Sequence, residues 1–265
     1  MKKIFVVTGA SSGFGKCVSN LLLEKETVDE IWLIARSKEK LEEVSKNINV
    51  KTKILLLDLT KSEDLKKYES ELKKEQVIIK VLINSAGYGK FDHSENLDLD
   101  TKLNMIDLNV KAPVSMIDYS LPSMEKGSKI MNIASCAGFQ PIPYINDYAS
   151  TKAFLLSYSR ALNYELKYRG IHVLAVCPFW TKTGFFDRAI DPKKKEVVIS
   201  YAAMYDPILV MKKAVRDLYN DRKDISVYGF VNNFQRFLVR ILPHTLIMKI
   251  WINSQKLNGT KDIRD

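Results

Sequence analysis

Short apolar segments alternate with longer amphipathic segments from the N-terminus to about residue 225. The apolar segments, rich in β-branched residues, span residues 4–7, 31–34, 54–57, 81–83, 130–133 and 173–176. Such segments are typical of strands buried on both faces of a parallel sheet. The stretches between them, including 21–26, 38–46 and 62–74, carry charges at a spacing that favours helices. This alternation predicts β-α-β units and a single doubly wound α/β sheet of the Rossmann type, flanked by helices.

The chain continues with two further helical patterns beyond the last predicted strand, near residues 225–228. Apolar residues recur at helical spacing in the first of them, at Phe230, Phe234, Phe237, Leu238 and Ile241. Basic residues lie on its opposite face, Pro243 ends it, and a second helix is predicted over residues 246–256. No linker precedes this part, so we expect residues 229–265 to extend a single domain formed by residues 1–228. The extension is compatible with docking on an anionic membrane, covering a cleft, a subunit interface or plain packing.

Composition narrows the classes of protein. Of the 265 residues, 46% are hydrophobic, which excludes intrinsic disorder. The three cysteines are widely spaced, so neither a disulfide framework nor a structural zinc site is expected. The apolar N-terminal segment is too short for a signal peptide, and no segment reaches the ~18–20 apolar residues of a membrane span. These features predict a cytoplasmic protein that holds no metal.

A formal net charge of +10 is the one unusual global property. Such an excess is compatible with nucleic acid, an anionic membrane surface, an anionic cofactor or simple solubility. No helix or strand interleaves basic and aromatic residues as nucleic-acid modules do, so we expect no nucleic-acid partner.

A glycine-rich turn, Thr8-Gly9-Ala10-Ser11-Ser12-Gly13-Phe14-Gly15, lies between the first predicted strand and the first predicted helix. Glycines allow a tight turn there, and free N–H groups at the start of a helix stabilise the charge of a pyrophosphate. The position of the turn therefore indicates a dinucleotide site.

A Tyr-x-x-x-Lys motif, Tyr148 to Lys152, supplies candidate acid–base chemistry. The two side chains lie on one face of a helix, where the lysine cation is expected to lower the tyrosine pKa toward the working pH. Ser135 follows the fifth predicted strand, where ligands of open α/β sheets bind, and can hydrogen bond a substrate oxygen.

These motifs, with Asn84-Ser85-Ala86-Gly87 and Asn109 between them, resemble in order and spacing the short-chain dehydrogenase/reductase family. The resemblance implies a nicotinamide dinucleotide cofactor, with Ser135, Tyr148 and Lys152 catalytic. Asn109 would steady a water that relays protons. Cofactor contacts are implied for Gly9, Ser11, Ser12, Gly13, Phe14, Gly15, Arg36, Ser37, Asp58, Leu59, Asn84, Ala86, Gly87, Tyr148, Lys152, Pro178, Thr181 and Thr183.

The residues after the second predicted strand favour NADP(H) over NAD(H). Ala35 cannot accept hydrogen bonds from the ribose 2′-hydroxyl as an acidic residue would. Arg36 can pair with a 2′-phosphate, helped by Ser37 or Lys38. Against this preference, Ser12 stands where many NADP-preferring relatives carry a basic residue. Asp58 matches the family residue that contacts the adenine amine.

The segment of about 179–205 corresponds to the substrate lid of the family. Phe179 replaces the usual glycine there, which is expected to reshape the pocket floor. Aromatic residues predict an apolar substrate pocket, with candidate contacts at Ser135, Tyr144, Tyr148, Phe179, Trp180 and Phe185. The lid also carries Lys193-Lys194-Lys195, which is either a solvated loop or an attraction for an anionic group.

The sequence thus predicts an NADP(H)-dependent oxidoreductase that interconverts a secondary alcohol and a ketone on a bulky hydrophobic substrate such as a hydroxysteroid or bile acid. The C-terminal extension shows a looser likeness to hydroxysteroid dehydrogenases and long-chain ketoacyl reductases, at Leu242-Pro243 and Met248-Lys249-Ile250. A 3-ketoacyl reductase and a non-catalytic NADP(H)-binding sensor or scaffold are the alternatives. Expected partners are a small hydrophobic substrate, further copies in a homodimer or homotetramer, and a weakly bound membrane surface.

Overall fold

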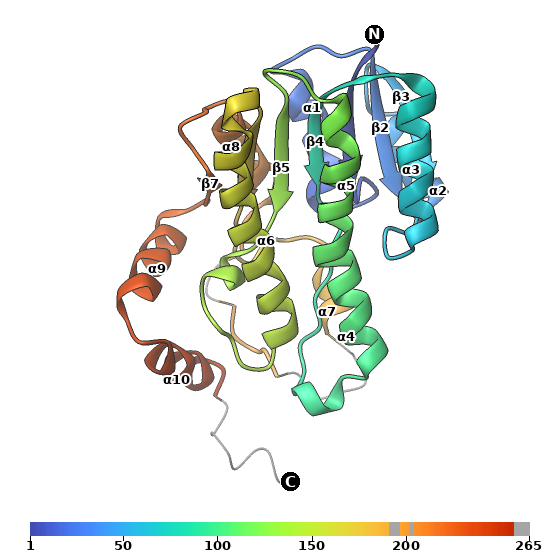
Figure 1. Cartoon of the computed structure of the whole chain (residues 1–265). Helices are drawn as coiled ribbons and strands as arrows, with labels where there is room; N and C mark the ends of the chain where they lie inside the picture. The colour runs from blue at the N-terminus through green and yellow to red at the C-terminus, as the bar shows by residue number, and fades with distance from the viewer. Residues whose placement is uncertain (191–196, 202–203, 257–265) are drawn as a thin grey trace.

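The computed structural model describes residues 1–190, 197–201 and 204–256. Its centre is a seven-stranded parallel sheet (Figure 1). In spatial order the strands are β3 (Lys51–Leu56), β2 (Glu30–Ala35), β1 (Lys3–Thr8), β4 (Ile78–Asn84), β5 (Lys129–Ile133), β6 (His172–Val176) and β7 (Ile225–Ser226). The predicted doubly wound Rossmann-type sheet is confirmed.

Helices cover both faces of the sheet. One face carries α3 (Ser62–Glu75), α5 (Ala112–Ser120) and α6 (Asn146–Glu165), in front in Figure 1. The other carries α1 (Gly13–Leu23), α2 (Lys38–Ser45) and α8 (Pro207–Leu218). Alternate residues of β1 divide between the two layers, because successive strand side chains point to opposite faces. Ile4 and Val6 join the first core cluster, and Phe5 and Val7 join the second.

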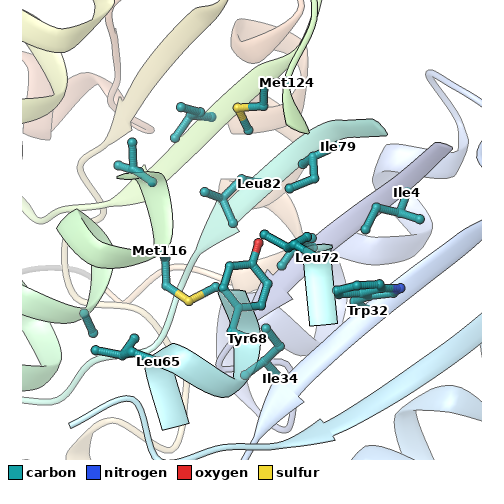
Figure 2. Packing of buried hydrophobic residues seen from close by; sticks show 14 of the residues in the cluster. Ile4, Trp32, Ile34, Leu65, Tyr68, Leu72, Ile79, Leu82, Met116 and Met124 are labelled. Carbon is teal, nitrogen blue, oxygen red and sulfur yellow. The ribbon is translucent and has the colours of Figure 1, made fainter. Parts of the chain in front are cut away.

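The core in front of β1 and β2 packs around two large aromatic side chains (Figure 2). Trp32 and Tyr68 are fully buried, and their rings pack edge to face with the ring centroids 6.4 Å apart. Burial raises the pKa of Tyr68, whose hydroxyl shares a 2.7 Å hydrogen bond with the Ser120 hydroxyl. The only polar atom of the Tyr68 side chain is therefore satisfied inside an apolar layer.

Two details of the predicted elements were wrong. The third strand is not buried on both faces: β3 lies at the edge of the sheet, pairs only with β2 and leaves Leu56 exposed. An edge strand keeps one row of backbone groups open, and charged side chains such as Lys51 and Lys53 protect it. The predicted helical stretch at 21–26 ends earlier, because α1 stops at Leu23.

Shorter elements connect this framework. The helix α4 (Leu99–Ile106) continues into a π-helical segment, η2 (Asp107–Lys111). This segment leads directly into α5. The remaining short helices are η1 (Ser94–Asn96), η3 (Leu121–Ser123), η4 (Cys136–Phe139), η5 (Leu166–Arg169) and α7 (Phe186–Ala189). In Figure 1, α7 lies beyond the carboxyl ends of the strands.

The C-terminal extension forms the two expected helices, α9 (Phe230–Ile241) and α10 (His244–Ser254). Pro243 separates them, as predicted. Figure 1 places both at the margin of the molecule, beyond the carboxyl ends of the strands, and α9 packs against η4. In the described part of the chain, no helix combines the length and apolar character that crossing a membrane requires.

Candidate active site

The strand order reverses at β1, whose neighbours are β2 on one side and β4 on the other. Ligands of open α/β sheets bind in the crevice that such a reversal leaves at the carboxyl ends of the strands. A continuous cavity of about 850 Å³ occupies this position and extends past residues 178–188 to α9 and α10. This volume lies within the range of pockets that bind cofactors and other small molecules.

The glycine-rich turn forms the floor of one end of the cavity. Gly9 has a positive φ of 63°, and a Cβ there would lie 2.8 Å from the Ala86 backbone nitrogen. A Cβ at Gly15 would lie 2.4 Å from the Gly9 carbonyl oxygen. Only glycine fits these two close approaches. The turn thereby lays residues 11–14 along the cavity at the start of α1, where backbone N–H groups favour an anion.

Thr8 joins the glycine-rich turn to the end of β4. Its buried hydroxyl accepts hydrogen bonds from the backbone N–H groups of Ser85, at 3.0 Å, and Ala86, at 3.2 Å. The same hydroxyl donates to the Ile83 carbonyl at 3.2 Å. The sequence pattern does not reveal this role, although Thr8 immediately precedes the first glycine of the turn.

The far end of the cavity is basic. Arg36, Ser37, Asp58 and Leu59 line it, as expected for the adenosine side of a dinucleotide site. Arg36 Nη1 lies 4.0 Å from Asp58 Oδ2. Lys40 also lines this end and was missed in the sequence; its signal is a basic residue in the first turn of α2.

Lys38, by contrast, is paired with Glu42 at 3.8 Å on the exposed side of α2. It is not among the lining residues of the described chain. Lys40, and not Lys38 as predicted, is therefore the second cation that lines this end of the cavity with Arg36.

Ser135, Tyr148 and Lys152 meet in the middle of the cavity. Ser135 lies two residues beyond the end of β5, and its side chain interacts with that of Tyr148 on α6. Lys152, one helical turn beyond Tyr148, is buried and donates from Nζ to the Ile133 carbonyl at 2.7 Å. Its Nζ lies 5.7 Å from the centroid of the Tyr148 ring. The arrangement presents a phenol and a serine hydroxyl together beside a buried cation.

The expected lowering of the Tyr148 pKa does not occur in this structure. Burial of the phenol is the largest effect and raises its pKa to about 12, although the hydrogen bond with Ser135 acts in the opposite direction. Burial also lowers the pKa of Lys152 to about 8. The physical reason is that the Lys152 ammonium is directed to a backbone carbonyl, so desolvation of the tyrosine is not offset.

Asn109 supports the site from behind. It lies in the π-helical segment η2 and is buried. Its side chain accepts from the Tyr88 N–H at 3.1 Å and donates to the Tyr88 carbonyl at 2.8 Å and to Thr151 Oγ1 at 3.1 Å. The side-chain amide thus fixes the segment after β4 against α6. Pro113 lies four residues later and has no N–H to donate to the Asn109 carbonyl.

Several predicted site residues do not line the cavity, as far as the described residues define its wall: Gly15, Asn84, Asn109 and Tyr144. Gly15 instead permits the turn. Asn84 is buried in the sheet and donates to Asn132 Oδ1 at 2.9 Å. Tyr144, at a positive φ of 68°, packs its ring edge to face against His93 at 4.6 Å. The remaining predicted cofactor and substrate residues all line the cavity.

The lid segment supplies an aromatic wall. Phe185 lies 5.3 Å from the Tyr148 ring, and Trp180 lies 5.7 Å from Phe179, measured between ring centroids. A bridge between Thr181 and Tyr205 ties the two ends of the segment together. Thr183 lies close to Gly13, from which a Cβ would be 3.7 Å away. The lysines at 193–195 lie outside the described residues.

The C-terminal extension covers the cleft, which is one of the four roles that the sequence left open. Trp251 on α10 donates from Nε1 to the Pro143 carbonyl at 3.0 Å, in the loop before α6. The side chain of Gln255, just after α10, accepts from the N–H groups of Ile199 and Ser200, both at 2.9 Å, on the lid. No local pattern of residues predicts these contacts, which join segments far apart in the chain. Residues of the extension that line the cavity are Gln235, Leu238, Val239, Leu242, Ile247, Ile250, Trp251, Ser254 and Gln255.

The sequence profile described as "short chain dehydrogenase" matches residues 3–194, which include the glycine-rich turn and the Ser135, Tyr148 and Lys152 cluster. The chain belongs to the short chain dehydrogenase family. Membership of this family makes the chain an oxidoreductase by family.

Among individual members of the short chain dehydrogenase family, the chain is 38% identical over 188 residues to very-long-chain 3-oxoacyl-CoA reductase-B of Danio rerio. It is 36% identical over 182 residues to hydroxysteroid dehydrogenase-like protein 1 of Gallus gallus. These matches cover 67% and 66% of this chain but only 59% and 54% of the two relatives.

Among solved structures, a short-chain dehydrogenase from Sphingobium yanoikuyae in complex with NADPH is 25% identical, with a TM-score of 0.73. That comparison covers 91% of this chain and 96% of the other. The likeness therefore extends beyond the matched profile and takes in part of the chain that follows the lid.

Proposed function

We propose that this protein uses NADPH to reduce a ketone to a secondary alcohol in a long, apolar molecule, and that the substrate is a 3-oxoacyl thioester. The observation that carries the proposal is the single cavity in which the glycine-rich turn, the Ser135–Tyr148–Lys152 cluster and an apolar wall are continuous. The first two parts fit a nicotinamide dinucleotide, and the third fits an aliphatic chain.

The residues divide into a binding group and a reacting group. Residues 11–14 would hold the pyrophosphate, and Lys152 would hold the nicotinamide ribose. The bound cofactor supplies the hydride. Ser135 orients the substrate carbonyl by hydrogen bonding to its oxygen, and Tyr148 gives that oxygen a proton as negative charge develops. Asn109 fixes the Tyr88 segment, and its main-chain carbonyl is our candidate to hold the relay water.

Reduction is the direction that the electrostatics favour. A phenol whose pKa is raised to about 12 is protonated at neutral pH, which is the form that reduction of a ketone requires. Oxidation of an alcohol would require the phenolate, which burial disfavours.

Two cations support NADPH over NADH. Arg36 and Lys40 both line the adenosine end of the cavity, and Ala35 offers no carboxylate to a ribose 2′-hydroxyl. A 2′-phosphate would meet a forked guanidinium donor and a second positive charge. This preference holds in our proposal although Ser12 is not basic.

The choice of a 3-oxoacyl thioester rests on two features. The wall beyond Tyr148 is apolar and aromatic, from Phe179 and Phe185 to Trp251. The relative from Danio rerio is named as a reductase of very-long-chain 3-oxoacyl-CoA. A hydroxysteroid or bile acid is the second candidate, which the name of the relative from Gallus gallus favours. The intact cluster of Ser135, Tyr148 and Lys152 argues against a non-catalytic sensor. We keep a homodimer or homotetramer as a prediction.

A substrate series tests this proposal through the loss of NADPH absorbance. With 3-oxoacyl-CoA compounds of increasing chain length, we expect kcat/KM to rise about fourfold per added CH2 until the apolar wall is filled, because each buried CH2 contributes ~0.8 kcal/mol. NADPH should exceed NADH by at least about tenfold in kcat/KM, the effect of one charged hydrogen bond. A preference for ketosteroids would support the second candidate, and turnover of neither class, with NADPH bound, would support the sensor alternative.

A further inference from the structure

The outward face of α9 is an exposed apolar surface. Phe230, Phe234, Phe237 and Ile241 are 85%, 53%, 57% and 61% exposed, and they recur at helical spacing on one side of the helix. We call these four residues the α9 face. Proteins rarely expose such a contiguous apolar patch unless something binds there.

The opposite side of α9 is directed into the molecule. Asn232 and Val239 are the buried residues of this helix, and Val239 lines the cavity. Asn232 donates to the Tyr228 carbonyl at 2.5 Å, which ties the first turn of α9 to the chain before it. The α9 face therefore points away from the core, and within the described part of the chain nothing covers it.

The charges around the α9 face indicate what kind of partner binds there. Residues 225–256 contain no aspartate or glutamate but include Arg236, Arg240, Lys249 and Lys256. Arg240 and Lys249 are exposed, whereas Arg236 is held 5.6 Å from the Phe139 ring. Aromatic and aliphatic residues flanked by uncompensated cations are the pattern of a helix that lies in the interface of an anionic membrane.

A second copy of this chain fits the same surface less well. A two-fold interface places the same patch on both sides. The cations around the α9 face would then meet their own copies, with no acidic residue in 225–256 to pair with them. Anionic lipid headgroups supply the missing negative charge.

We infer that α9 docks the protein on an anionic membrane surface, with the α9 face inserted among the lipid chains and Arg240 and Lys249 at the headgroups. The helix has 12 residues, so it lies in the interface and does not cross the bilayer. Because the inner side of α9 lines the cavity, docking brings the cavity next to the lipid phase. This inference rests on the surface of α9 and not on the proposed reaction.

Cosedimentation of the full chain with vesicles, without substrate or cofactor, tests the inference. We expect binding to vesicles that contain phosphatidylserine, weaker binding to phosphatidylcholine alone, and loss of the difference at high salt. The triple variant Phe230→Ser, Phe234→Ser, Phe237→Ser should weaken binding more than about tenfold, since each ring transfers apolar area into the bilayer. The matched control, Tyr164→Ser with Tyr168→Ser, changes aromatic residues that are 81% and 86% exposed elsewhere and should bind as the original chain does.

Charge-reversal variants measure the electrostatic contribution to vesicle binding. Arg240→Glu with Lys249→Glu should remove the preference for phosphatidylserine, whereas Lys66→Glu with Lys167→Glu, exposed residues of α3 and η5, should retain more of it. Circular dichroism shows whether each variant folds. Two results would overturn the inference: vesicle binding that the phenylalanine variant does not reduce, or no vesicle binding together with dimers in sedimentation velocity that the same variant dissociates. The second result would make the α9 face a subunit interface.

Discussion

Replacement of Tyr148 by phenylalanine is expected to reduce kcat for ketone reduction by about three orders of magnitude, within the range of general acid catalysis. The variant removes one hydroxyl from a half-buried ring that lies beside Ser135 and Phe185. Binding of NADPH, measured by fluorescence titration, should be nearly unchanged, because the glycine-rich turn and the basic end of the cavity are untouched.

Tyr158→Phe is the matched control for this variant. Tyr158 lies on the same helix and stacks on Phe154 at 5.8 Å, and it is not among the described residues that line the cavity. We expect it to retain full activity. Equal activity of Tyr148→Phe and Tyr158→Phe would show that Tyr148 is not the proton donor.

The second large effect concerns Lys152 and pH. Burial lowers the pKa of Lys152 to about 8, so the side chain is charged at neutral pH and loses its proton well below the ordinary range for lysine. We expect kcat/KM for NADPH, which reports groups of the free enzyme, to be constant at pH 6 to 7 and to fall as pH rises through about 8. Tyr148 does not contribute to the fall near pH 8, because its pKa is raised to about 12.

Two variants test whether Lys152 causes the fall in kcat/KM near pH 8. Lys152→Met should lower kcat/KM by about two orders of magnitude or more at neutral pH and abolish the fall near pH 8. Lys152→Arg keeps a positive charge across the range, so any activity that it retains should not decline near pH 8. A profile of the original chain that stays level to pH 9.5 would contradict the assignment.

Local sequence patterns were sufficient for the framework. Continuous apolar segments favour strands, although the third became a partly exposed edge strand. A glycine-rich turn after the first strand allows backbone segments to approach closely, as Gly9 approaches Ala86. The spacing of Tyr148 and Lys152 likewise required only that α6 be a helix. Such features depend on neighbours in sequence, which is why the sequence predicts them well.

Features that depend on distant contacts were less accessible. Asn84 is the last residue of β4, where a cofactor residue would lie, yet its side chain donates a hydrogen bond to Asn132 on the neighbouring strand. Tyr144 lies close to Tyr148 in sequence, but its left-handed backbone directs the ring to His93. The contacts of Gln255 with the lid span more than 50 residues of chain. The pKa of Tyr148 depends on burial by several elements at once, so motif spacing gave the wrong direction.

The central claim is that this cavity transfers a hydride to a ketone beside Tyr148. Incubation of the protein with NADPH carrying deuterium at C4 of the dihydronicotinamide, on the transferred face, and a long-chain 3-oxoacyl thioester tests it most directly. The account predicts a 3-hydroxyacyl product with one deuterium on the carbinol carbon by mass spectrometry, and almost none with Tyr148→Phe. Bound NADPH with no labelled alcohol from any ketone of the series would contradict it.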